Sequence, residues 1–132
     1  MTLPEPMKAP SIDHDAFMAK RLADQEEWLQ RANVAQAKAA HAFARLLKIA
    51  EESDTGQARR IALFLAGTFN GRAYPFDLYE LRGLDVAIGD DMLVCLDALR
   101  WARADLFKLV PDGESRIEAM IKLWGIKPVP QE

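Results

Sequence analysis

The sequence has very little cysteine and histidine, which narrows the chemistry open to the chain. Its single cysteine, Cys95, has no second cysteine with which to form an internal disulfide. Its two histidines, His14 and His41, lie too far apart to share a metal site on one helix. Phosphate-binding loops and Ser/His/Asp arrangements in a recognisable context are missing as well. We therefore predict that the chain is not an enzyme and uses no metal and no cofactor.

Long hydrophobic runs are also missing. No apolar segment approaches the ~20 residues needed to cross a bilayer, and the N-terminus has no apolar core of signal-peptide type. We therefore expect a cytoplasmic protein with no membrane contact. Half of the residues are hydrophobic and 28% are charged, which is typical of one globular domain. The net charge of -3 argues against a protein that works mainly by coating nucleic acid.

Proline and glycine are absent between Pro10 and Gly56. Ala, Leu, Lys, Arg, Gln and Glu dominate there, which predicts one long helix over 13–53. Residues 1–12 contain three prolines and are expected to form a flexible leader. From residue 28 onward the long helix has a regular apolar face, made of Trp28, Ala32, Ala35, Ala39, Ala42, Phe43, Leu46, Ile49 and Ala50.

The apolar face of the long helix is interrupted before residue 28 by Arg21 and Asp24, and only Phe17 continues it. We therefore expect the C-terminal half of the helix to pack on the domain, while the first half projects or pairs with another chain. The small alanines along the seam would let a neighbouring helix approach closely. A homodimer through the long helix is the alternative to packing within the monomer.

A second helix is predicted over about 55–69, apolar almost all round and therefore buried at the centre of the fold. Asp54 is expected to cap it, with Gln57 completing a capping box. Gly67 would mark a close helix crossing, and Asn70-Gly71 would end the helix in the left-handed conformation.

Three further helical segments complete the predicted fold. Asp77 and Glu80 form a second capping box over a short helix that ends at Gly83. The apolar face that follows predicts one helix over 85–110, and the last helix ends at Gly125. The sequence thus predicts an all-α small helical bundle over 13–126, with a flexible tail at 127–132.

Basic residues follow one flank of the long helix, and no acidic residue occurs between Glu27 and Glu51. Such a row could bind phosphates or an acidic protein surface, or could be a solvated flank. A separate candidate for partner binding is the smaller apolar patch around Trp101. The candidate binding residues are Arg31, Lys38, His41, Arg45, Lys48 and Trp101.

Arginines and carboxylates also gather in residues 54–85. Arginines near a helix N-terminus oppose the helix dipole, so an anion site is one interpretation. The other is a structural ion-pair cluster, because acids in the same segment, Glu80 among them, would satisfy the guanidinium groups. The residues of this predicted cluster are Asp54, Arg59, Arg60, Asp77, Arg82 and Asp85.

The strings DTGQARR and FLAGTFNGRAYPFDLYELRGLD, a Leu-rich helix and the closing LWGI resemble a family of unknown function. Its members are small proteins of proteobacterial plasmids and integrative elements, and the resemblance covers roughly residues 50–126. It implies an accessory protein of mobile DNA, and such proteins often bind a host or element protein, including host defence complexes. It carries over no catalytic residue.

We therefore expect a non-enzymatic interaction or regulatory protein that binds a host or element protein. The alternative is a nucleic-acid-binding accessory protein that uses the basic flank of the long helix.

Overall fold

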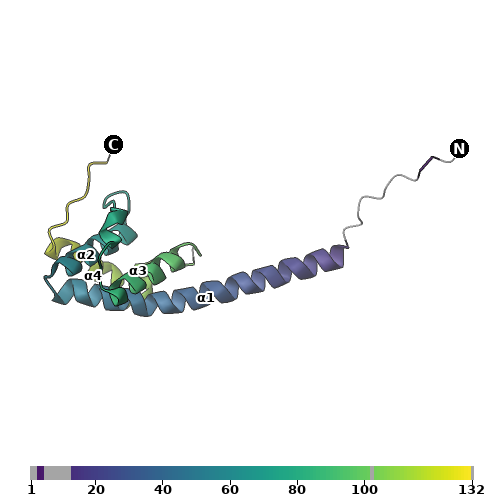
Figure 1. Cartoon of the computed structure of the whole chain (residues 1–132), viewed down its shortest axis with the longest axis horizontal. Coiled ribbons are helices and arrows are strands. Elements are labelled where there is room, and N and C mark those ends of the chain that lie inside the picture. Colours follow the sequence, from purple (N-terminus) through teal and green to yellow (C-terminus); the bar gives the residue numbers. More distant parts are fainter. Residues whose placement is uncertain (1–2, 5–12, 102, 132) are drawn as a thin grey trace. The chain divides into compact units, whose positions relative to one another are not determined.

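A computed structural model of the chain describes residues 3–4, 13–101 and 103–131. These residues form helices and no strand (Figure 1). The helices are α1 (His14–Glu52), α2 (Gly56–Phe69), the 3-10 helix η1 (Leu78–Leu81), α3 (Val86–Leu99), the 3-10 helix η2 (Leu106–Leu109) and α4 (Gly113–Leu123). The predicted all-α bundle with a long N-terminal helix is confirmed.

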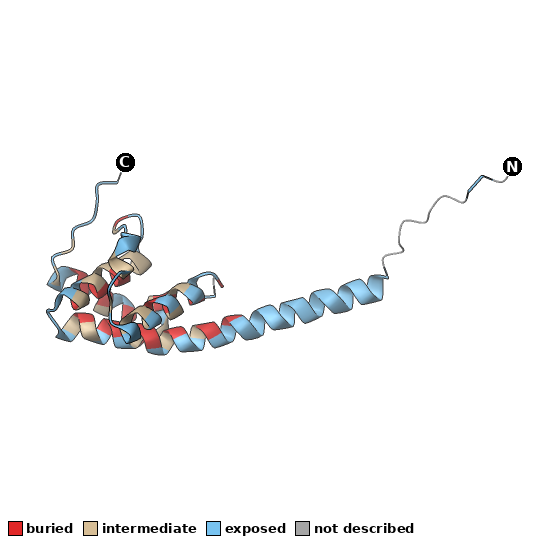
Figure 2. Cartoon of the chain, viewed as in Figure 1, coloured by how far each residue is buried: buried red, intermediate tan, exposed pale blue. Residues whose placement is uncertain are grey.

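The chain divides into two compact units, Met1–Arg31 and Ala32–Glu132, and α1 contributes residues to both. The boundary falls inside the region that the sequence predicted as one domain. The predicted flexible leader at 1–12 lies outside the described residues, apart from Leu3 and Pro4. In the first unit, every residue of α1 from 14 to 31 is exposed, as the pale blue ribbon of Figure 2 shows.

The second unit holds the hydrophobic core, to which all four α-helices contribute. The largest fully buried side chains are Phe43, Leu46, Leu47, Ile61, Leu65, Met92, Cys95, Ile117 and Met120. Between them lie alanines that are at most 5% exposed, five from α1 and three from α2: Ala32, Ala35, Ala39, Ala42, Ala50, Ala58, Ala62 and Ala66. The alanine seam of α1 is therefore covered within the chain.

The N-terminus of α2 is capped by Thr55 rather than by the predicted Asp54. The Thr55 hydroxyl accepts a hydrogen bond from the amide of Ala58 at 3.1 Å. Gln57 does not complete a capping box, because its side-chain oxygen accepts from the backbone amide of Asp85 at 2.9 Å. That bond ties the start of α2 to the start of α3. As predicted, α2 lies in the core, where its Ile61 and Leu65 are fully buried.

The end of α2 also differs from the prediction. Asn70 caps the helix in an extended conformation, and its side-chain oxygen accepts from the amide of Ala73 at 3.1 Å. Gly71 is not among the residues with positive φ. A Cβ on Gly67 would lie 3.1 Å from Phe76 Cβ and 3.2 Å from the Tyr74 carbonyl oxygen. The close approach at Gly67 is therefore made by the following connection and not by a crossing helix.

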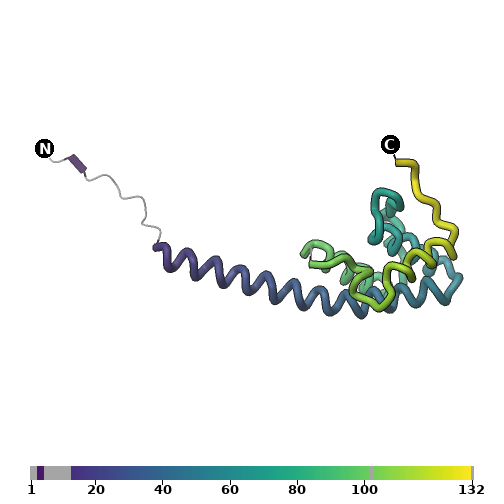
Figure 3. Tube along the Cα trace, turned by 180° about the vertical axis from the view of Figure 1, so that it is seen from behind, coloured from purple at the N-terminus to yellow at the C-terminus, as the bar shows by residue number. Residues whose placement is uncertain are grey.

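The connection between α2 and α3 lies on the same side of the second unit as the C-terminal tail (Figure 3). The tail at 127–131, predicted to be flexible, forms two hydrogen bonds with it. The amide of Val129 donates to the Ala73 carbonyl at 2.8 Å, and the Gln131 side chain donates to the Arg72 carbonyl at 3.1 Å.

The helix predicted over 85–110 is in fact interrupted. The α-helix α3 ends at Leu99, and a separate 3-10 helix, η2, begins at Leu106. The break turns η2 onto α2, where the Phe107 ring packs edge-on against Phe69 with 5.4 Å between centroids. A helix that continued straight could not bring this ring back to α2, so tertiary packing overrides the local periodicity.

The start of α4 is close-packed against η2. Asp112 caps the helix in the left-handed conformation at φ 55°, and the buried Gly113 follows. The end of α4 was predicted correctly. Gly125 has φ 64°, and the amide of Ile126 donates to the Ile121 carbonyl at 3.1 Å, which is the pattern of a glycine-terminated helix.

Candidate functional site

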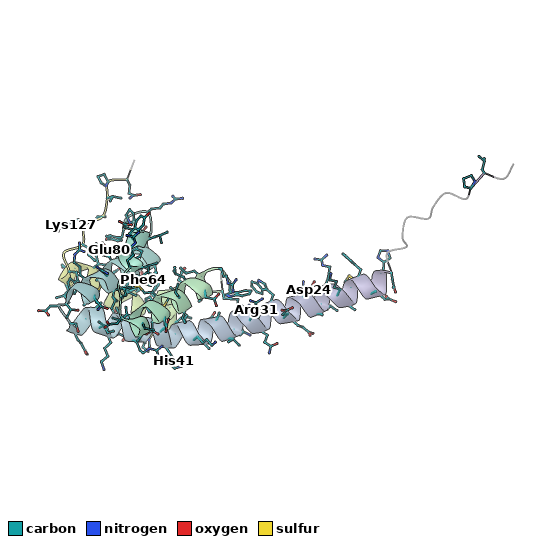
Figure 4. All side chains as sticks on the ribbon, viewed as in Figure 1. Asp24, Arg31, His41, Phe64, Glu80 and Lys127 are labelled. Carbon is teal, nitrogen blue, oxygen red and sulfur yellow. The ribbon has the colours of Figure 1, made fainter. Side chains whose placement is uncertain are left out.

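The basic flank of α1 is only partly available for binding. In the second unit, Lys38, His41 and Lys48 are exposed, and His41 points away from the other helices in Figure 4. Arg45 lies on the same flank but is paired with an acid of α3. Arg31 is exposed too, and it belongs to the first unit.

The pairing of Arg45 with Asp91 is bidentate. Arg45 Nε donates to Asp91 Oδ2 at 2.9 Å and Nη2 donates to Oδ1 at 2.8 Å. The Asp91 side chain is only 15% exposed, so this carboxylate is sheltered while the arginine covers it from outside. Hydrogen bonding to Asp91 raises the pKa of Arg45 above its ordinary value. The charge of the guanidinium is therefore already paired within the chain, which makes Arg45 a poor candidate for phosphate contact.

Cys95 lies in the core one helical turn after Asp91. Burial, with a smaller contribution from the charge of Asp91, raises the pKa of the Cys95 thiol to about 12. A thiol with this pKa is almost entirely protonated at neutral pH, and Cys95 is fully buried, so we interpret it as a packing residue.

The prediction of a binding patch around Trp101 is wrong, because Trp101 is buried. Its side chain is 8% exposed and packs with Ala32 and Ala35 of α1. The guanidinium of Arg100 lies 4.6 Å from the ring centroid of Trp101 and is itself paired with Asp97 at 2.7 Å. Trp101 therefore forms a second, smaller hydrophobic cluster with these two alanines and offers no open surface to a partner.

The arginines and acids of residues 54–85 form fewer ion pairs than the sequence suggested. Arg60 Nε lies 3.3 Å from Glu80 Oε2, and Arg60 also donates to the backbone carbonyl of Arg82. Among the described residues, no ion pair joins Asp54, Asp77 or Asp85 to an arginine. Arg59 is exposed, as are those three acids. Arg60 thus acts as a bridge from α2 to η1, and the rest of the predicted cluster is solvent-facing.

The bridge holds a short segment, residues 77–86, in which Leu78, Tyr79 and Val86 face solvent while Leu81 and Leu84 pack against the core. Leu78, Tyr79 and Val86 are 69%, 68% and 78% exposed. We call residues 77–86 the η1 segment. Its other polar contacts fix the backbone: Asp77 Oδ1 accepts from the amide of Tyr79 at 2.9 Å. The result is a constrained segment that presents large apolar side chains outward.

Tyr79 and Arg82 of the η1 segment are stacked. The Arg82 guanidinium lies 4.5 Å from the centre of the Tyr79 ring, within the range of a cation–π contact. A cavity of about 460 Å³ lies beside the segment and is lined by Ile49, Thr55, Gly56, Gln57, Arg60, Gly83, Asp85 and Ile88. An exposed aromatic ring, a guanidinium and a neighbouring cavity are features that protein-binding surfaces commonly combine.

Sequence reasoning missed Leu78, Tyr79 and Val86 because it treated the segment only as a capped turn. The length of the helix gives no signal either, because the 3-10 helix η2 also has four residues and buries Leu106.

Within the described residues, no three His, Cys, Asp or Glu side chains are grouped as ligands for a metal ion. None of the described helices is long and apolar enough to span a membrane.

The fold and these surfaces define a small all-α protein. Comparison with family models matches residues 40–125 to the Family of unknown function (DUF7673), and the chain belongs to that family. None of the curated proteins and none of the solved structures compared with the chain matches it.

Proposed function

We propose that the chain is a non-enzymatic interaction protein whose partner protein docks on the η1 segment. The observation that carries the proposal is the exposure of Leu78, Tyr79 and Val86, at 68–78%, in a segment that hydrogen bonds hold in place.

The free energy of binding favours docking of a partner on the η1 segment. Large apolar side chains that face water gain free energy when a partner covers them. Tyrosine and arginine are enriched among the residues that dominate binding energies, and the Tyr79–Arg82 stack supplies both. Because Arg60 and Asp77 already restrain the backbone, little conformational entropy is lost when a partner binds.

The η1 segment lies inside the matched family region, residues 40–125. A regulatory role in a bacterial mobile element, acting on a host or element protein such as a defence complex, belongs to the same proposal. Its support is the resemblance of residues 50–126 and the surface just described. The setting can be checked by identifying the genes that neighbour the coding sequence.

The test is a quantitative pull-down from the native host, read by mass spectrometry. Full-length wild-type chain is compared with Leu78→Ser and Tyr79→Ala. Leu123→Ser is the matched control, because Leu123 is 68% exposed but lies on α4. The expected result is a protein captured by the wild type and by the control and lost with both η1 variants.

Retention of that protein by the η1 variants would contradict the proposed docking site. Turnover of a small substrate that depends on Arg59 or Asp54 would contradict the non-enzymatic role.

A nucleic-acid-binding function remains the second proposal, and the exposure of Lys38 and Lys48 on a flank without acids supports it. Because Arg45 is paired with Asp91, the phosphate contacts would fall to the two lysines. This function predicts binding at low salt that weakens steeply as salt rises, and weaker binding by Lys38→Glu and Lys48→Glu. The absence of binding at low salt would rule it out.

A further inference from the structure

The first unit carries a stripe of large apolar side chains on the outside of α1. Met18, Leu22 and Leu29 are 53%, 55% and 41% exposed. Their part of the helix is pale blue in Figure 2 and includes the labelled Asp24 and Arg31 in Figure 4. These residues lie in the half of the helix that was predicted to project or pair with another chain, but they are not on the apolar face that was predicted to run through Phe17 and Trp28.

The spacing of the stripe follows a heptad repeat. Steps of four, three and four residues lead from Met18 through Leu22 and Gln25 to Leu29. Alternating steps of three and four residues place side chains at the a and d positions of a coiled coil. Leu22 and Leu29 then occupy a positions, while Met18 and Gln25 occupy d positions.

The stripe ends where the core begins. From residue 32 onward, the apolar side chains that continue the heptad spacing of the stripe, such as Ala39, Phe43 and Leu46, are fully buried within the second unit. The seam open to another chain is therefore confined to the part of α1 between residues 14 and 31.

The charges beside the stripe are complementary to those of an identical, parallel helix. In the heptad frame Arg21 takes a g position and Glu26 takes the following e position. In a parallel two-stranded coiled coil, each g residue faces the e residue five positions later on the other chain. Two identical chains would therefore form two Arg21–Glu26 pairs, one on each side of the seam.

An antiparallel pair does not offer this match. When Met18 faces Leu29 of the other chain, Glu26 faces Ala19 and has no cation opposite it. In the parallel arrangement, by contrast, Gln25 faces Gln25, and two side-chain amides can donate to and accept from one another. A polar layer of this kind fixes the register of a coiled coil.

We propose that a second copy of this chain binds to the Met18–Leu22–Leu29 stripe, so that the first units of two chains form a short parallel, in-register coiled coil. The proposal does not depend on the docking of another protein on the η1 segment, which belongs to the second unit. Residues 14–31 supply little more than two heptads, so the association is weak and depends on concentration.

Sedimentation equilibrium on the full chain over a wide concentration range tests the dimer. The expected mass rises from 14.8 kDa towards twice that value as concentration increases. Leu22→Glu places two carboxylates in the seam and is expected to weaken the dimer about a hundredfold. Phe17→Glu is the matched control, because Phe17 is 48% exposed but lies off the seam, and it should leave the dimer intact.

Two further sets of variants test the orientation. Arg21→Glu or Glu26→Arg alone should weaken the dimer, and the double reversal should restore it. With Cys95→Ser as background, Met18→Cys should form an intermolecular disulfide under mild oxidation, because d residues face each other only in the parallel register.

A mass of 14.8 kDa at every concentration would overturn the proposal, as would a dimer that survives Leu22→Glu. A dimer that the double reversal fails to restore and that Met18→Cys fails to crosslink would overturn the parallel register. Circular dichroism of each variant shows that the helices are kept. The η1 variants are expected to lose the captured partner without any change in the mass measured by sedimentation. The docking proposal and the dimer proposal can therefore fail independently of each other.

Discussion

Gly113 should not tolerate even one additional carbon atom. It is the first residue of α4 and is buried against η2. A Cβ at this position would lie 1.8 Å from the Phe107 carbonyl oxygen, 2.7 Å from its carbonyl carbon and 3.0 Å from Val110 Cγ2. Two of these atoms belong to the backbone, so rotating a side chain cannot make room. Gly113→Ala must move η2 away from α4 by more than 1 Å.

The size of the effect follows from two opposing contributions. Alanine is favoured over glycine within a helix by about 1 kcal/mol. Overpacking a well-filled site costs about 1–3 kcal/mol and sometimes more. Because the displaced backbone also carries Phe107, which packs on Phe69 of α2, we expect a cost at or above the top of that range. The net loss of unfolding free energy is then about 2 kcal/mol, and at ~3–5 °C per kcal/mol for a chain of 132 residues the melting temperature falls by about 7 °C.

Gly56→Ala is the matched control. Gly56 is the first residue of α2, just as Gly113 is the first residue of α4, but a Cβ there would meet nothing within 4 Å. We expect Gly56→Ala to be neutral or to stabilise the protein by up to about 1 kcal/mol. Urea unfolding followed by circular dichroism measures both variants. If Gly113→Ala proves as stable as Gly56→Ala, the close packing of η2 on α4 is refuted.

Three other changes test further features. Thr55→Ala should cost about 1 kcal/mol of unfolding free energy through loss of the α2 cap, while Asp54→Ala should change it by less than about 0.5 kcal/mol. Arg116 binds Glu51 through two hydrogen bonds of 3.1 and 2.6 Å, so a double-mutant cycle with Arg116→Met and Glu51→Gln should give a coupling of about 1–2 kcal/mol. Burial raises the Cys95 pKa from 9.0 to about 12, so at pH 8 the native thiol should react with an alkylating reagent roughly a thousandfold more slowly than the unfolded one.

Each of these three expectations would be contradicted by a particular result. Equal costs for Thr55→Ala and Asp54→Ala would mean that the cap is misplaced. A coupling near zero would mean that solvent screens the Arg116 pair.

The raised Cys95 pKa also has a consequence for stability at high pH. The unfolded thiol ionises above about pH 9 while the folded thiol keeps its proton, so the free energy of unfolding falls from there towards pH 12. Cys95→Ala should remove that part of the pH dependence, and an unchanged slope would contradict the shift.

Features that depend on neighbouring residues alone could be predicted from the sequence. The glycine that ends α4 was predictable because Gly125 follows the last apolar residues and only glycine adopts positive φ without strain. The buried position of α2 was predictable because an apolar helix has no face to offer to water. The cap of α2 was misplaced by one residue, since both Asp54 and Thr55 have the chemistry of a cap and only the backbone geometry distinguishes them.

Features that depend on distant contacts were not predictable in this way. The apolar periodicity runs through residues 100–105 without a glycine or proline, so nothing local marks the end of α3 at Leu99. The break lets Phe107 pack on Phe69, a contact between residues 38 positions apart in the sequence. The candidate site had the same difficulty: Trp101 carried an apolar signal but is covered by α1, whereas Leu78 and Tyr79 carried the same signal and are not.

The eight buried alanines of α1 and α2 have a consequence for how this chain can change over generations. A single-base change in an alanine codon yields valine, threonine, serine, proline, glycine, aspartate or glutamate. All of these except glycine have more side-chain atoms than alanine, and most of the seven bring a polar group or break a helix. At positions such as Ala39 and Ala62, which are fully buried between neighbouring helices, almost every single-base substitution is therefore expected to destabilise the fold. Relatives of this chain should diverge first at its large, half-exposed side chains and last at its smallest ones.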